Sequence, residues 1–153
     1  MRRAAATALA SLALLAGCGS EEPDTPGPCL ADADAFVAAL ERVPRPITLT
    51  GDIAISDCLV DNQPSGELAQ IGTATVEAAT RLSARARRGD GPAAIQLGYL
   101  VGAVRRGAAE TGGIHTDLVR RLESAAQTGS AGGLTGAAGV AYERGLAAGD
   151  RTG

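Results

Sequence analysis

Residues 92–110, PAAIQLGYLVGAVRRGAAE, combine a proline at the first position with apolar side chains at helical spacing. Pro92 suits the first turn of a helix, where a backbone N–H has no intrahelical partner. Ala94, Gly98 and Gly102 recur at every fourth residue and form a ridge without bulky side chains. Such a ridge lets a second helix approach closely. We expect the helix that precedes it in the sequence to pack on this ridge, as the other half of an antiparallel hairpin.

Three further segments carry apolar residues at the spacing of an amphipathic helix: 31–43, 65–88 and 114–127. Asp32 or Asp34 can cap the first of them and favours the positive end of its dipole. The break at 89–92 contains a glycine stop, an aspartate and a proline, which end one helix and begin the next. The predicted fold class is therefore mainly α, a small helical bundle of three to four helices in a domain that covers residues 29–128.

Alternating apolar residues over 47–56 predict one short β-hairpin beside the helices. A three-residue loop, 50–52, pairs Leu49 with Ile53 and Ile47 with Ile55, so that all four side chains share one face. Because a lone hairpin is marginal in water, this face must lie on the helices. An irregular loop, or a short helix through 55–60, remains an alternative.

The last segment, residues 129–153, contains 8 glycines in 25 residues. A glycine inside a helix costs about 1 kcal/mol relative to alanine. Val140, Tyr142 and Leu146 have the spacing of a weak helix from about residue 137 to 148. We therefore expect a Gly/Ala-rich segment that forms a frayed helix or a flexible tail.

The N-terminus has the pattern of an export signal. Arg2 and Arg3 precede an uncharged run, 4–15, that is too short to span a bilayer. The run ends in LAGC at 15–18, which resembles the lipobox of bacterial lipoprotein precursors. The resemblance implies that residues 1–17 are a signal peptide and that Cys18 becomes the N-terminus and receives the lipid.

By this resemblance the protein is exported and its lipid holds it at the cell membrane or the outer membrane, with the domain outside the cytoplasm. Two or three acyl chains, such as palmitate, give stable anchoring, where one chain is marginal. Residues 18–28 contain three prolines, three acids and no large apolar side chain, which predicts a disordered tether behind the lipidated cysteine.

With Cys18 assigned to lipid, Cys29 and Cys58 remain, and an even pair in an exported chain predicts one structural disulfide. A redox-active pair normally has the spacing C-x-x-C, which the chain lacks. A metal site would favour nearby histidines, and the one histidine, His115, lies far away in the sequence. We expect neither a metal nor a cofactor.

The charge is mild, with 14 basic and 17 acidic side chains, and every basic side chain is an arginine. This balance, together with the export signal, argues against a nucleic-acid partner. Acids dominate residues 19–80 and arginines dominate residues 81–128. We expect the acidic part to pack against the basic part.

Arginine pairs suggest one binding site. Arg105 and Arg106, at the end of one predicted helix, can approach His115 at the start of the next, and guanidinium groups bind carboxylate and phosphate. These three residues are the candidate contacts for an anionic envelope ligand. The alternative is that the arginines cap helix dipoles and form ion pairs.

The sequence offers little for catalysis. It lacks G-x-S-x-G, H-E-x-x-H and a phosphate-binding loop, and it has one histidine and no cysteine outside the two assigned roles. The expected function is a non-catalytic binding or scaffold domain, anchored to the membrane, with an envelope protein as its partner. A binding module for an anionic ligand is the alternative, and a small hydrolase is the least favoured one.

Overall fold

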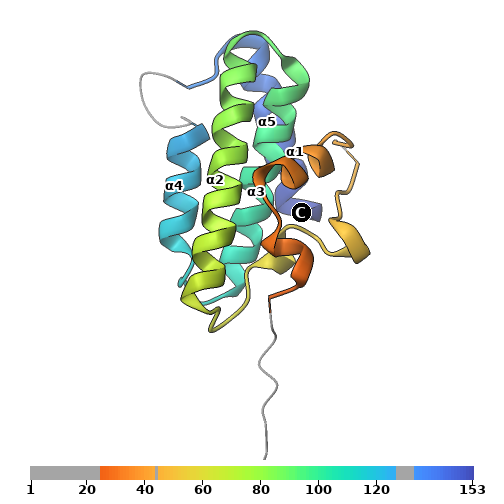
Figure 1. Ribbon diagram of the computed structural model, residues 1–153. Helices are drawn as coiled ribbons and strands as arrows, with labels where there is room; N and C mark the ends of the chain where they lie inside the picture. Colours follow the sequence, from red (N-terminus) through yellow and green to blue (C-terminus); the bar gives the residue numbers. More distant parts are fainter. Residues whose placement is uncertain (1–24, 44, 127–132) are drawn as a thin grey trace, which may run out of the picture.

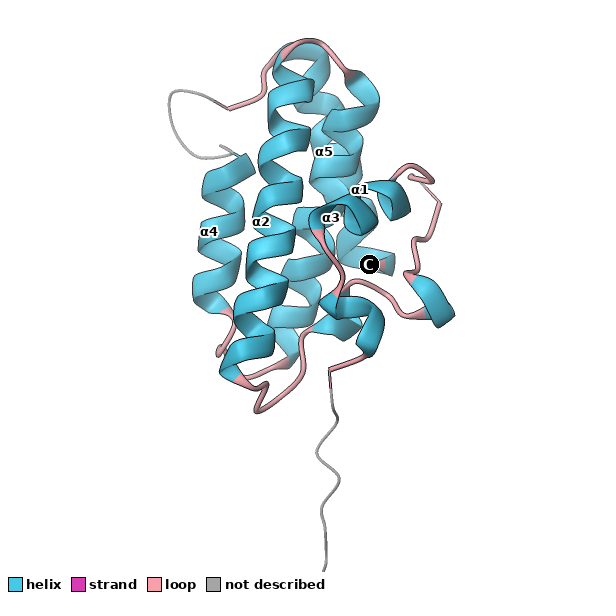
Figure 2. Ribbon diagram, in the orientation of Figure 1, coloured by secondary structure: helices cyan, strands magenta, loops and turns pink. Residues whose placement is uncertain are grey.

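The computed structural model describes residues 25–43, 45–126 and 133–153 (Figure 1). Within these ranges the chain forms five α-helices: α1 (Ala33–Leu40), α2 (Ser65–Arg87), α3 (Gly91–Glu110), α4 (Thr116–Ala126) and α5 (Gly136–Thr152). Figure 2 shows helices joined by loops, and the described residues contain no β-strand. The prediction of a mainly α fold with one disulfide is confirmed, with five helices in place of three or four.

Side chains cap two of these helices at their starts. The Oδ1 atom of Asp32 accepts a hydrogen bond from the backbone nitrogen of Ala35 at 3.0 Å, so Asp32 is the N-cap of α1. Asp90 does the same for α3 through the nitrogen of Ala93, also at 3.0 Å. Gly89, with a φ of +90°, turns the chain between α2 and α3 in a conformation that side chains disfavour.

Helices α2 and α3 are antiparallel neighbours, as the short break between them predicts (Figure 1). Helix α4 lies along α2 on the side away from α5, and α1 crosses over the bundle in front of α3. Gly72 gives α4 room on α2, because a Cβ atom at this position would lie 3.5 Å from the side chain of Leu118.

The ridge on α3 does not pack against α2, and our prediction of its partner is wrong. It packs against α5. A Cβ atom on Gly98 would lie 2.7 Å from the nitrogen of Leu146, and one on Gly102 would lie 2.7 Å from the nitrogen of Asp150. The hairpin partner α2 instead contacts another face of α3, and α5 brings glycines of its own, Gly145 and Gly149, to the ridge.

The close contact is reciprocal, since glycines of α5 meet the backbone of α3. A Cβ atom on Gly145 or Gly149 would lie 2.8 Å from backbone atoms of Ile95 or Ala103, respectively. Positions along both helices increase together, from the contact of Ile95 with Gly145 to that of Ala103 with Gly153. Helices α3 and α5 are therefore parallel. Helix α4, which lies between them in the sequence, returns the chain to the end of the bundle where α3 begins (Figure 1).

Residues 136–152 form a helix of 17 residues, longer than the weak helix predicted for 137–148, and they are not a flexible tail. Its interior glycines weaken the isolated helix, but they are the residues that let it lie against α3. Packing therefore stabilises α5 where its intrinsic propensity does not.

The segment 47–56 keeps the predicted register but forms no strand. Thr48 and Ala54 form one isolated antiparallel bridge, and the nitrogen of Leu49 donates to the carbonyl oxygen of Ile53 at 2.7 Å. These are the residue pairs that a hairpin with the three-residue loop 50–52 predicts. The ladder stops there because 3₁₀ turns occupy Thr50–Asp52 and Ser56–Cys58. Ile47 and Ile55 are buried against the helices, as the shared apolar face predicts.

Tyr99 joins this segment to the C-terminal helix from inside the core, where its side chain is fully buried. Its hydroxyl accepts a hydrogen bond from the nitrogen of Ile47 at 3.0 Å and lies 3.1 Å from the carbonyl oxygen of Thr152, to which it donates. One phenol thus links α3, the loop before α2 and the end of α5. In the described part of the chain, no helix combines the length and apolarity needed to cross a bilayer.

Candidate functional site

The disulfide between Cys29 and Cys58 is present, as predicted. It joins two short 3₁₀ turns, Gly27–Leu30 and Ser56–Cys58, and both cysteines are buried. The bond attaches the start of the described chain to the loop that leads into α2. Disulfides of this kind are typical of proteins outside the cytoplasm.

Residues 25–28 belong to the packed domain and not to the predicted tether. Thr25 is buried, and its hydroxyl oxygen accepts a hydrogen bond from Nε2 of Gln63 at 2.8 Å. The same Nε2 atom donates its second hydrogen to the carbonyl oxygen of Cys58 at 2.9 Å. Gln63 therefore fixes the entry of the chain to the disulfide loop. Cys18 and the rest of residues 1–24 lie outside the described residues, so lipidation stays a prediction.

His115 belongs to the same hydrogen-bond network. It is fully buried, with Nε2 at 2.8 Å from Oε1 of Gln63 and Nδ1 at 2.6 Å from the hydroxyl of Thr111. Since both hydrogens of the Gln63 amide nitrogen are used, its Oε1 is the acceptor, and the histidine carries its proton on Nε2. Burial lowers the pKa of His115, and the charge of Asp61 opposes this shift. His115 links the disulfide loop to the turn between α3 and α4.

The structure does not bring Arg105, Arg106 and His115 onto one open surface. Arg105 is exposed on α3, whereas Arg106 donates to the carbonyl oxygen of Arg151 at the end of α5. Both ring nitrogens of His115 have protein partners inside the domain. The geometry therefore does not assemble the anionic-ligand site that the sequence suggested.

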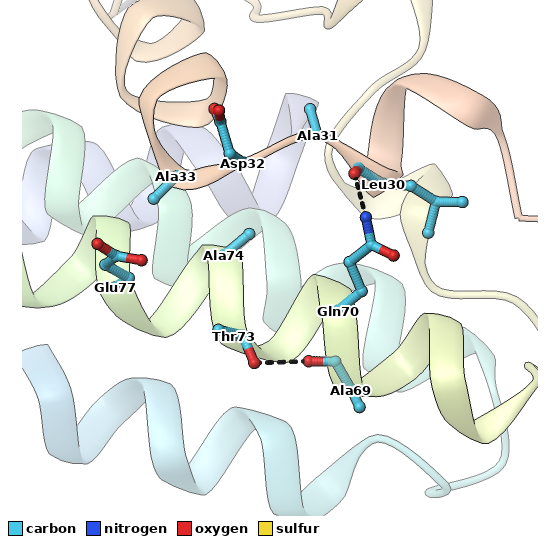
Figure 3. A pocket seen from close by; sticks show the side chains of 9 residues that line it. All are labelled: Leu30, Ala31, Asp32, Ala33, Ala69, Gln70, Thr73, Ala74 and Glu77. Carbon is cyan, nitrogen blue, oxygen red and sulfur yellow. Dashed lines mark hydrogen bonds between the residues drawn. The ribbon is translucent and has the colours of Figure 1, made fainter.

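A pocket of about 470 Å³ lies between the start of α1 and the middle of α2 (Figure 3). Alanine side chains form much of its wall, with Ala33 contributed by α1 and Ala69 and Ala74 by α2. Leu30, the last residue of the first 3₁₀ turn, and Ala31, in the extended link from that turn to α1, close one side. The wall is therefore apolar and made of small side chains.

Polar side chains at this pocket come from both elements. Asp32 lies on the α1 side, and Gln70, Thr73 and Glu77 follow one face of α2 (Figure 3). Gln70 uses its Nε2 to donate to the carbonyl oxygen of Leu30, which holds the end of the first 3₁₀ turn against α2. The two carboxylates give the rim of the pocket a negative charge.

Arg81 lies next to this rim and joins the acidic and basic parts of the chain. Its guanidinium group donates to Asp34 of α1 and to Glu77 of α2. These hydrogen bonds raise the pKa of Arg81, with Glu77 as the larger cause. All three side chains are largely exposed, so water screens the pairs. The expected packing of acidic against basic segments occurs at this point of the surface.

The sequence did not reveal this pocket. Asp32 was assigned a capping role, which it has, and Glu77 lies 45 residues further along an ordinary helix. Nothing local links the two, because the packing of α1 against α2 brings them together.

A second pocket, also of about 470 Å³, lies where α3 ends and α4 begins. It is lined by Arg105, Gly112, Gly113 and Thr116 among others. Within the described residues, no group of three His, Cys, Asp or Glu side chains could hold a metal ion.

Comparisons with protein-family models, with curated proteins and with solved structures each find no match to this chain.

Proposed function

We propose that the protein is a membrane-anchored envelope lipoprotein whose folded domain binds a partner protein outside the cytoplasm without catalysing a reaction. The observation that carries the proposal is the buried disulfide between Cys29 and Cys58. Its first cysteine, Cys29, lies 11 residues after the lipobox cysteine. A buried structural disulfide favours an oxidising compartment, which is where a lipobox would direct the domain.

The role of His115 supports binding over catalysis. The chain has one histidine, and in the folded domain both of its nitrogens serve the packing of the turn between α3 and α4. The disulfide uses two of the three cysteines. General-base and thiol chemistry therefore have few groups to use.

Membrane attachment is tested by replacing Cys18 with serine and separating membranes from soluble material. We expect the wild-type protein in the membrane fraction and Cys18→Ser in the soluble fraction or unprocessed. The double variant Cys29→Ala/Cys58→Ala is the control, because it removes two cysteines and should stay with the membrane. An unchanged membrane fraction for Cys18→Ser contradicts the proposal.

Partner binding is tested with a photo-crosslinking residue at one exposed position on each of the helices α1, α2, α4 and α5: Asp34, Ala84, Arg120 and Val140. On the anchored protein, at least one position should give a discrete cross-linked product of fixed size. The same position on Cys18→Ser should give less product, since release from the membrane dilutes the domain away from its partner. No discrete product at any of the four positions would refute a dedicated protein partner.

A further inference from the structure

We propose that the pocket between α1 and α2 receives a cationic side chain, an arginine or a lysine, of the partner protein. The assignment rests on the binding function proposed above and gives the chemistry of the partner. Its geometric basis is a pocket of about 470 Å³ with an apolar wall of alanines and a carboxylate on each of the two elements that form it (Figure 3).

The apolar wall suits the stem of a long basic side chain. Arginine and lysine lay their methylene groups along apolar surface and keep the charged end at a polar rim. Ala33, Ala69 and Ala74 offer such a surface, and small side chains leave the room for it.

The polar groups of the pocket present acceptors. Gln70 donates its amide to Leu30, and the hydroxyl of Thr73 donates to the carbonyl oxygen of Ala69 at 2.8 Å. Asp32 and Glu77 each accept one hydrogen bond within the chain and retain further acceptor capacity, as a carboxylate has about four lone-pair sites. A ligand that supplies donors and positive charge matches these acceptors.

Arg81 shows that one of these carboxylates, Glu77, binds a guanidinium group. It pairs with Glu77 from the neighbouring turn of α2 and with Asp34 of α1. A partner's guanidinium would approach Glu77 from the pocket side and would share that carboxylate with Arg81. Arg81 is therefore a competitor of the proposed ligand as well as a like charge beside it.

The exposure of the pocket favours a side chain over a small free molecule. Asp32, Ala69, Gln70, Thr73 and Glu77 are all exposed. Sites for small molecules bury most of the ligand, which an open surface pocket does not. A side chain carried by a polypeptide needs no such enclosure, because neighbouring contacts of the partner add to its affinity.

The experiment is a titration of the full chain, carrying Cys18→Ser so that it bears no lipid, followed by backbone amide shifts in NMR. The probe is N-acetyl-arginine methylamide, and N-acetyl-norleucine methylamide is the uncharged control. The arginine probe should shift the amides of residues 31, 69 and 73, and the norleucine probe should leave them in place.

Charge variants decide whether the carboxylates carry the binding. Glu77→Gln and Asp32→Asn should each weaken the arginine probe by about threefold, as expected for exposed charge pairs. Asparagine caps a helix as well as aspartate, so α1 stays intact. Arg81→Gln should tighten binding by about threefold, because it removes the competitor. Glu110→Gln, at an exposed acid on α3, is the matched control and should change nothing.

Equal shifts with both probes would mean that the pocket takes an apolar side chain, and this would overturn the proposal. Unchanged affinity in the double variant Asp32→Asn/Glu77→Gln would overturn it as well. Either result leaves the membrane and cross-linking experiments on the proposed function standing, because these do not involve the charge of the pocket.

Discussion

Gly98 of α3 and Tyr142 of α5 meet backbone to backbone. The direction in which a side chain would leave Gly98 points at the carbonyl oxygen of Tyr142, with the nitrogen of Leu146 2.7 Å from the position of a Cβ atom. Gly145 has the same relation to the carbonyl group of Ile95 on the other helix. A glycine Cα–H directed at a carbonyl oxygen is a weak hydrogen bond that recurs where two helices touch closely. The pair of helices depends on small residues at these positions.

Gly98→Ala should destabilise the protein by about 1–3 kcal/mol, because the added methyl group forces the two helices apart. In an isolated helix the same change would stabilise, since alanine has the higher helix propensity. Gly66→Ala in the first turn of α2 is the matched control. Nothing lies within 4 Å of its Cβ position, so it should be neutral or stabilise by about 0.5–1 kcal/mol. Urea unfolding followed by circular dichroism measures both, and equal effects would contradict the close packing.

Tyr99→Phe should cost about 1–3 kcal/mol of unfolding free energy, because it leaves the buried nitrogen of Ile47 without its acceptor. Thr80→Val is the control. It also removes a hydroxyl, which donates to the carbonyl oxygen of Val76 at 2.8 Å, but on an exposed face. Its effect should stay within about 0.5 kcal/mol. If both variants unfold at the same urea concentration as the parent, the phenol does not join the three elements.

Loss of the disulfide should cost roughly 3.5 kcal/mol, the entropy of closing a loop of 29 residues in the unfolded chain. The comparison uses Cys29→Ala/Cys58→Ala in a Cys18→Ser background, unfolded in urea with and without a thiol reductant. The reductant should destabilise the parent and leave the variant unchanged. A parent that is insensitive to a reductant which demonstrably opens the bond would argue against this stabilisation.

His115 should make stability depend on pH. Burial lowers its pKa in the folded state, so the unfolded chain binds the proton more readily. The stabilisation is complete above the unfolded value of 6.5 and declines as the pH falls from there towards the folded pKa, by at most about 1.4 kcal/mol per pH unit.

Unfolding free energies at pH 7.5, 6.5 and 5.5 test this, with His115→Gln as the variant that cannot titrate. Between these pH values most carboxylates remain ionised, so they contribute little. The parent should lose stability over this interval while His115→Gln keeps its own value. Identical pH dependence in the two proteins would place His115 in water.

Local patterns predicted the helices and the disulfide well. Neighbouring residues alone determine the cap at Asp32 and the turn at Gly89. The pairing of the two cysteines follows from the oxidising compartment that the export signal predicts. The register of Leu49 with Ile53 also followed from alternation alone.

The position of α5 could not be predicted in this way. Glycine lowers helix propensity wherever it stands, and only the backbone of Ile95 and Tyr99 across the interface makes Gly145 and Gly149 favourable. The burial of His115 could not be predicted for a similar reason. Its Nε2 partner inside the domain is Gln63, which lies 52 residues earlier in the sequence.

Hydrogen exchange tests the packing of α5 on α3 most directly. The amides of residues 139–152 in the parent should exchange as slowly as those of residues 95–108 in α3, because the two helices open together. In Gly98→Ala the protection of α5 should fall first. Rapid exchange throughout 139–152 in the parent, with α3 still protected, would show a flexible tail and contradict the structure described here.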